Sequence, residues 1–168
     1  HDPRVQNAIP LKGFENVPCI YQFMKALLRA EPNLSLDSDH MMIISPDEGG
    51  MGRAVTFANY LGMDVGMFYK RRDYTRIVDG KNPIVAHELK RRKAAKVFIA
   101  STFGLFTNGL AKFDAAYDQG IIDRVLTTNL VYQTPELLSR PYYVNVDLSK
   151  YIALLIDNLN HNSSLQDL

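Results

Sequence analysis

The chain has 168 residues, of which 46% are hydrophobic and 22% are charged, which fits one well-buried domain. Its 19 Lys and Arg against 18 Asp and Glu give a net charge of only +1, so we expect neither nucleic acid nor a membrane as a partner. No apolar run approaches the roughly 18 residues of a membrane-spanning helix. The single cysteine, Cys19, cannot form an internal disulfide, so we predict a cytoplasmic protein.

Strand-like and helix-like segments alternate along the chain. Short apolar or β-branched runs predict strands at 41–45, 65–69, 96–101, 124–128 and 142–147. Helical spacing of apolar residues predicts helices at 19–30, 51–61, 110–120 and 149–160. For the last helix we expect Ser149 to be the N-cap, with an apolar face made of Ile152, Leu155, Ile156 and Leu159. The alternation predicts an α/β fold with a mostly parallel sheet flanked by helices.

One stretch, 70–96, does not follow this pattern. It carries ten basic side chains and three acidic ones, more than half of all Lys and Arg. A strand, a loop and a crossover helix are expected here, yet IVAHE (84–88) continues into LKRRKAAK without a turn signal. The sequence therefore predicts either an unusual fold in this stretch or missing residues after position 88.

The turn SPDEGG (45–50) follows the first predicted strand and leads into a helix. Ligands of open parallel sheets bind at the carboxyl ends of strands, and adjacent glycines let backbone amides approach an oxyanion. With Arg53 in the following helix, the pattern indicates a phosphate, and Asp47 and Glu48 indicate Mg²⁺ or sugar hydroxyls beside it. The alternative is a plain turn in which a carboxylate caps the helix.

Two further segments also follow predicted strands. KRR (70–72) suits a polyphosphate, because Lys supplies a mobile charge and Arg a bidentate fork. The alternatives are a solvated loop and, least favoured, a site for single-stranded nucleic acid. STFGLFTNG (101–109) offers hydroxyls and glycines for a phosphate or ribose, but Phe103, Leu105 and Phe106 equally suit a core plug. Neither the histidines nor Cys19 form a convincing hydrolytic constellation.

Together, IISPDEGGMGRA, YKRRDYTR, STFGLFTNG and VLTTN, in this order, resemble the C-terminal half of ribose-phosphate pyrophosphokinases over nearly the whole chain. The resemblance implies a type I phosphoribosyltransferase-like fold and transfer of the diphosphoryl group of Mg-ATP to ribose 5-phosphate, giving 5-phosphoribosyl 1-pyrophosphate and AMP. It also implies a Mg²⁺ cofactor, a homohexamer, and phosphate or ADP as regulators, the latter through a loosely similar tail, NSSLQDL.

The resemblance assigns roles to particular residues. Lys70 and Arg72 correspond to loop cations that stabilise the transferring group. The opening HDPRVQ resembles a catalytic histidine segment. The implied substrate-binding residues are Asp47, Gly49, Gly50 and Arg53, and the implied metal ligands are His1 and Asp47. Transfer of this kind depends on positioning and charge neutralisation, so it needs no general-base triad.

The resemblance also predicts the domain organisation. Residues 1–15 are expected to end an N-terminal phosphoribosyltransferase-like domain, since HDPRVQNAIP has no signal-peptide core and reads as the interior of a longer polypeptide. Residues 16–147 form the C-terminal domain, with an apparent gap after 88, and 148–168 a terminal helix and tail. The ribose 5-phosphate loop of the family is not in the sequence. A non-catalytic regulatory relative that binds the true enzyme is therefore one alternative, and a phosphoribosyltransferase with no ATP requirement is another.

Overall fold

The five strands of the structure are all parallel and form two separate sheets. The computed structural model describes residues 7–8, 16–68 and 84–164. In it β1 (Met42–Ser45) pairs with β2 (Asp64–Met67), while β3 (Phe98–Ser101), β4 (Arg124–Thr128) and β5 (Tyr143–Val146) pair in that order. The predicted α/β class and parallel strand direction are confirmed. The strands are divided between two sheets, because no described strand lies between β2 and β3 to join them.

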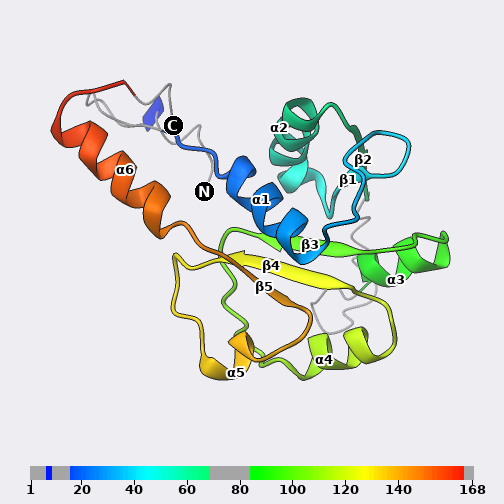
Figure 1. Ribbon diagram of the computed structural model, residues 1–168. Coiled ribbons are helices and arrows are strands. Elements are labelled where there is room, and N and C mark those ends of the chain that lie inside the picture. The colour runs from blue at the N-terminus through cyan, green and yellow to red at the C-terminus, as the bar shows by residue number, and fades with distance from the viewer. Residues whose placement is uncertain (1–6, 9–15, 69–83, 165–168) are drawn as a thin grey trace.

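Helices flank both sheets (Figure 1). They are α1 (Ile20–Ala30), α2 (Met51–Leu61), α3 (Ile84–Arg91), α4 (Ala111–Asp118), α5 (Pro135–Leu138) and α6 (Ser149–Asn160). Gly62 and Gly120, which follow α2 and α4, have left-handed φ values of 65° and 66° that favour glycine. The short α5 begins at Pro135, and the Thr134 side chain caps it by accepting a hydrogen bond from the Leu137 amide at 3.2 Å.

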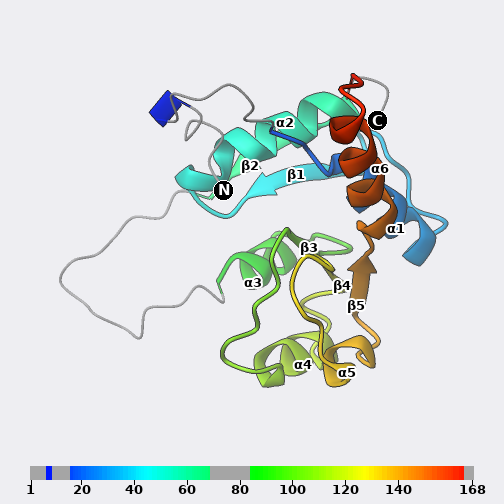
Figure 2. The same cartoon turned by 90° about the vertical axis from the view of Figure 1, so that its left-hand side faces the viewer.

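The main core lies on the inner face of α1. Its buried side chains Ile20, Phe23, Met24 and Leu27 pack with Leu126 and Val146 of the three-stranded sheet. Phe23 also meets Phe57 of α2 edge to face, with ring centroids 6.2 Å apart. Figure 2 shows the β1–β2 pair with α2 above the three-stranded sheet, and α1 beside both. The first helix therefore packs against both halves of the domain.

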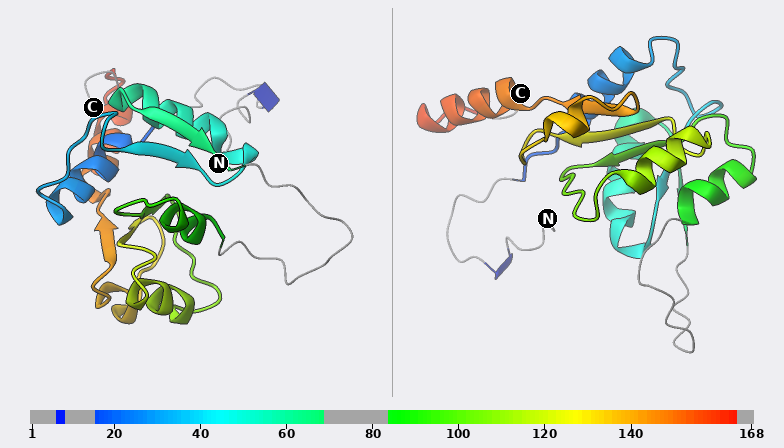
Figure 3. Two further views of the ribbon diagram at one scale, coloured as in Figure 1. Left: turned by 90° about the vertical axis from the view of Figure 1, so that its right-hand side faces the viewer. Right: turned by 90° about the horizontal axis from the view of Figure 1, so that it is seen from below.

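A second core covers the other face of the three-stranded sheet. Ile121, Ile122, Val125 and Tyr142 are buried there, with Phe113 of α4 packed against them. Figure 3 shows α4 and α5 on the side of this sheet opposite α1. In the part of the chain that the structure describes, no helix is both long and apolar enough to span a membrane.

Three details of the secondary structure differ from the sequence prediction. The stretch 70–96 was expected to contain a strand, a loop and a crossover helix; its residues Ile84–Arg91 form one helix, α3, which runs unbroken through Glu88 and Leu89. Ser149 is the first residue of α6 and its side chain makes no capping bond; Asp147 Oδ1 instead accepts the Ser149 amide at 2.9 Å. Only part of the predicted apolar face of α6 is covered, because Ile156 and Leu159 are exposed while Leu155 is buried.

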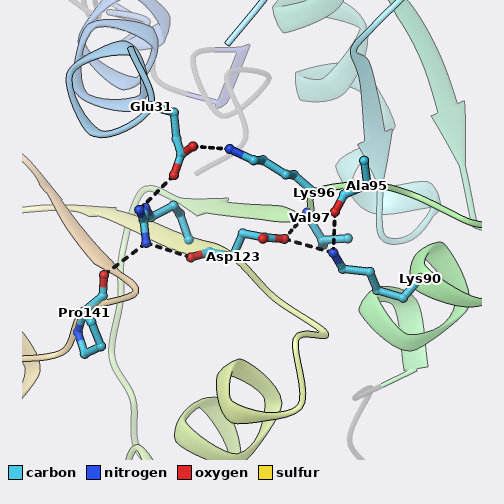
Figure 4. Close-up of polar contacts among 8 residues, drawn as sticks. Glu31, Lys90, Ala95, Lys96, Val97, Asp123 and Pro141 are labelled. Atoms are coloured by element: carbon cyan, nitrogen blue, oxygen red, sulfur yellow. Dashed lines mark hydrogen bonds and ion pairs between the residues drawn. The ribbon is translucent and has the colours of Figure 1, made fainter. Parts of the chain in front are cut away.

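A network of ion pairs ties α1 and α3 to the amino ends of β3 and β4 (Figure 4). The Glu31 carboxylate, at the end of α1, pairs with Lys96 and with Arg124, the latter at 2.8 Å. Asp123 Oδ2 accepts hydrogen bonds from Lys90 Nζ at 3.1 Å and from the Val97 amide at 2.7 Å. Because each carboxylate has two donors, the network fixes the helix ends relative to the sheet.

A second polar cluster joins α4 to the segment between α5 and β5. Asp114 accepts hydrogen bonds from the Tyr142 hydroxyl at 2.7 Å and from the Arg140 guanidinium at 2.9 and 3.1 Å. These bonds hold the pKa of Asp114 below its usual value. Burial and the hydrogen bond to Asp114 raise the pKa of Tyr142 to about 12. The cluster therefore holds Asp114 as a carboxylate at neutral pH.

We expect this cluster to stabilise the fold in a pH-dependent way. A carboxyl group with a lowered pKa in the folded state stabilises the protein above its unfolded pKa of about 4, and this contribution is lost as pH falls through the lowered value. Asp114→Asn should therefore lower the melting temperature at pH 7, and the gap to the wild type should shrink below about pH 4. Thermal melts from pH 7 to 3 check this. Asp118→Asn, exposed on the same helix, is the control; a gap independent of pH would contradict the account.

Candidate functional site

The predicted phosphate-binding turn lies at the carboxyl end of β1, where the chain passes into α2. Ser45 is the last residue of β1, η2 (Glu48–Gly50) is a single turn of 3-10 helix, and α2 follows at Met51. In a parallel sheet this edge is where helix N-termini and loops converge on a ligand. The structure thus places Asp47, Gly49, Gly50 and Arg53 in one continuous strand–turn–helix unit.

The Asp47 carboxylate shapes this turn. Asp47 has an extended backbone, and its Oδ1 accepts a hydrogen bond from the Gly50 amide at 2.9 Å. This is the geometry of a helix N-cap, so the alternative in which a carboxylate caps the turn is confirmed for Asp47. Capping and ligand binding are compatible, because a carboxylate has two oxygens and several lone pairs.

The two adjacent glycines have different reasons to be glycine. A Cβ on Gly50 would lie 2.7 Å from Ser45 Oγ, so a side chain there would clash with a buried hydroxyl. A Cβ on Gly49 would meet only Asp47 Oδ1, at an ordinary 3.5 Å, and Gly49 is exposed. Packing therefore accounts for Gly50 but not for Gly49. An exposed glycine at a helix start leaves the backbone open to a ligand.

Arg53 is exposed in the first turn of α2. The N-terminus of a helix carries partial positive charge, and this first turn contains no acidic residue. Arg53 therefore adds a full positive charge to the partial charge of this helix start, next to the SPDEGG turn.

Of the other predicted site residues, three are not placed. His1, Lys70 and Arg72 lie outside the described residues. The end of β2 is described as far as Phe68, whose amide donates to the Ser45 carbonyl at 3.0 Å. The strand that precedes YKRR in the sequence therefore ends beside the SPDEGG turn.

The basic residues of α3 and the loop after it have structural partners. Arg91 and Arg92 both pair with Glu88 at 2.7 Å, and Lys90 and Lys96 belong to the network at the amino ends of the strands. The Arg pairs lower the pKa of Glu88 to about 2. Local ion pairs thus account for these four cations, and KRR (70–72) stays the candidate cationic segment predicted from the sequence.

The segment STFGLFTNG lines a cavity at the carboxyl end of β3. The cavity measures about 300 Å³ and its lining is mainly apolar, with Ile99, Val125, Phe106 and Phe113 among the residues around it. Phe106 packs edge to face on Phe113 and Tyr143, as the core-plug alternative expected. Phe103 and Leu105, however, are 49% and 68% exposed, so the same expectation is wrong for them.

A metal ion bound at the turn would need ligand atoms from the substrate as well as from the protein. Among the described residues, no three His, Cys, Asp or Glu side chains are grouped so that they could hold a metal ion. Mg²⁺ usually takes one or two carboxylates and fills its remaining positions with water and substrate phosphates. Asp47 fits the role of a single carboxylate ligand to a Mg²⁺ that arrives with a polyphosphate.

Known proteins similar to this chain share one name. A ribose-phosphate pyrophosphokinase of Mycoplasmopsis pulmonis is 27% identical over all of this chain and 57% of its own length. One of Vibrio parahaemolyticus is 25% identical over 95% of the chain, and ribose-phosphate pyrophosphokinase 2 of Schizosaccharomyces pombe is 23% identical over 95%. No protein-family model matches the sequence. The chain spans about half the length of the curated relatives it matches.

The alignment is longer than the chain. Its comparison with the Mycoplasmopsis pulmonis protein extends over 194 positions, more than the 168 residues of this chain. Part of the relative therefore has no counterpart within the aligned span. The phosphoribosyltransferase-like fold, predicted from the resemblance, is consistent with the parallel sheets and flanking helices of the structure.

Substitutions of Asp47 should separate its capping role from its charge. Asp47→Ala removes the acceptor of the Gly50 amide and should lower the free energy of unfolding by about 1 kcal/mol. Asp47→Asn keeps a capping oxygen and should retain most of that stability. Urea denaturation of the three proteins measures the difference, and equal losses in both variants would contradict the capping role. Glu48→Gln, an exposed neighbour, is the control.

Proposed function

We propose that this chain is the C-terminal half of a ribose-phosphate diphosphokinase, which transfers the diphosphoryl group of Mg-ATP to ribose 5-phosphate. The observation that carries the proposal is the turn at the carboxyl end of β1, where a capping carboxylate, an open glycine and Arg53 surround a helix start. Similarity to pyrophosphokinases over 95% or more of the chain supports it.

The proposed roles follow from the chemistry of the group that is transferred. Gly49 presents its backbone amide to a phosphate, and Gly50, whose own amide is donated to Asp47 Oδ1, lets the backbone approach closely. Asp47 binds ribose hydroxyls or Mg²⁺, and Arg53 adds a full positive charge. Lys70 and Arg72 neutralise the charge on the transferring diphosphoryl group. When bound, Mg²⁺ neutralises phosphate charge, and His1 together with Asp47 would hold it.

The domain organisation is part of the same proposal. Residues 16–147 form the C-terminal domain, residues 1–15 end a preceding domain, and 148–168 form a terminal helix and tail. Leu148 and Ile152 of this last part pack in the core of α1, which joins α6 to the domain. The exposed Ile156 and Leu159 support assembly into a homo-oligomer, a hexamer in the proposed family, with phosphate or ADP as regulators. A single cysteine suits the cytoplasm.

A second candidate, a non-catalytic relative that binds and regulates an active enzyme, is favoured by one observation. Helix α3 continues without interruption through Glu88 and Leu89, and the relative's sequence has positions that this chain lacks. A chain without a ribose 5-phosphate loop retains the fold and its surfaces but not the full substrate site. Such a protein should bind to an active pyrophosphokinase and change its rate without forming AMP itself.

One assay distinguishes the two candidates. The diphosphokinase should form AMP from ATP only when both ribose 5-phosphate and Mg²⁺ are present. Lys70→Ala should reduce this rate by about 100-fold or more, because a group that stabilises transition-state charge is lost. Lys93→Ala, which removes the same charge from an exposed residue after α3, is the control and should remain active.

Two results would count against the diphosphokinase. If the wild-type protein forms no AMP, this result contradicts the catalytic proposal and favours the regulatory one. A Lys70→Ala variant with nearly full activity would leave the reaction standing but remove Lys70 from it. Circular dichroism of each variant confirms that a lower rate is not a loss of folded protein.

A further inference from the structure

Ser45 carries a buried hydroxyl at the start of the proposed binding turn, and no role is predicted for it from the sequence. It is the last residue of β1 and only 1% exposed. Its Oγ donates a hydrogen bond to the Asp47 carbonyl oxygen at 2.7 Å. Because the bond bridges Pro46, it fixes the direction in which the chain leaves the strand and so the orientation of the Asp47 backbone.

The main chain of Ser45 joins the turn to the neighbouring strand. Ser45 lies opposite Met67 in the parallel register, and its carbonyl accepts the Phe68 amide at 3.0 Å. One residue therefore holds the turn through its side chain and the end of β2 through its backbone. A change in its position would move both strand ends together.

The Ser45 hydroxyl also restricts which residue position 50 can accommodate. A Cβ added to Gly50 would lie only 2.7 Å from Ser45 Oγ. Gly50 in turn donates its amide to Asp47 Oδ1. Ser45, Asp47 and Gly50 thus form a closed set of contacts in which the hydroxyl fixes the carbonyl of Asp47 and the Gly50 amide fixes its carboxylate.

We propose that Ser45 is a positioning residue for substrate binding at this turn. It does not touch the ligand; it holds the Asp47 carboxylate and the amides of η2 in the geometry that a phosphorylated sugar needs. Binding to such a site is strong only when its groups are held in place before the ligand arrives. This inference rests on the proposed diphosphokinase function.

The test compares Ser45→Ala with Ser139→Ala. Ser139, exposed at the end of α5, also donates its hydroxyl to a backbone carbonyl, that of Glu136 at 2.8 Å, but lies outside the site. AMP formation is measured while ribose 5-phosphate is varied. Ser45→Ala should raise the KM for ribose 5-phosphate about tenfold with a much smaller change in kcat, because a loosened turn weakens substrate binding. Ser139→Ala should leave both constants unchanged.

Each outcome of this comparison is decisive. Suppose that the wild type is active and that Ser45→Ala has the wild-type KM for ribose 5-phosphate, with at most a fall in kcat that matches its unfolded fraction. Ser45 would then be merely structural, and the inference would be wrong. If the wild type forms no AMP, the proposed function fails and the inference fails with it. Should Ser45→Ala not fold, Ser45→Cys fills the same space with a weaker donor and should show the same rise in KM.

A double substitution tests the geometry independently of activity. Gly50→Ala should lower the melting temperature by about 3 °C or more, since its Cβ meets the Ser45 hydroxyl. In the Ser45→Ala background the hydroxyl is gone, so the same substitution should cost much less. Additive effects in the double variant would contradict the closed set of contacts on which the inference depends.

Discussion

The packing of α1 is the interaction on which the rest of the domain depends. Within the described residues, the β1–β2 pair and the three-stranded sheet share no ladder of backbone hydrogen bonds. What connects them is the apolar face of α1, which packs on Leu126 and Val146 on one side and on Phe57 of α2 on the other. Burial of each such side chain contributes about 1.5–3 kcal/mol. Because the contacts of α1 position the two sheets, they also position any site formed by the ends of the strands.

The candidate site depends on this arrangement because it is built at strand ends. The turn after β1 is held from within by Asp47 and Gly50, and from the side by the bond between the Phe68 amide and the Ser45 carbonyl. At the amino ends of β3 and β4, ion pairs of Glu31 and Asp123 with the surrounding Lys and Arg side chains anchor helices to the sheet. The domain thus has one edge, at the amino ends of β3 and β4, where ion pairs anchor helices, and a second edge, at the end of β1, where Gly49 and Arg53 are exposed.

Much of the fold followed from patterns in the sequence. Short apolar runs predicted all five strands, since their period and length differ from those of helices. Helix ends at Gly62 and Gly120 were predictable because left-handed backbone favours glycine. The helical state of residues 84–88 could not be predicted, because an apolar run of that length suits either a strand or a helix. Long-range contacts decide which of the two forms. The division into two sheets also depends on contacts that no local pattern contains.

The candidate site could be predicted only in part. Carboxylates and glycines after a strand indicated the turn, and the structure places Asp47, Gly49, Gly50 and Arg53 there. Ser45 was missed because a serine before proline is common in turns; its burial and its contact with Gly50 become visible only in three dimensions. The exposure of Phe103 and Leu105 could not be predicted either, since burial depends on which elements cover a loop.

The central claim is that the turn after β1 binds the phosphorylated substrate, and backbone amide chemical shifts test it most directly. Uniformly ¹⁵N-labelled protein would be titrated with ribose 5-phosphate in the presence of Mg²⁺, with glycine amides as reporters in the turn after β1 and in the loop after β3. The account predicts saturable shifts at Gly49 and Gly50, and no more than small ones at Gly104 and Gly109 of the loop after β3. Shifts confined to Gly104 and Gly109, or none at saturating ligand, would contradict it.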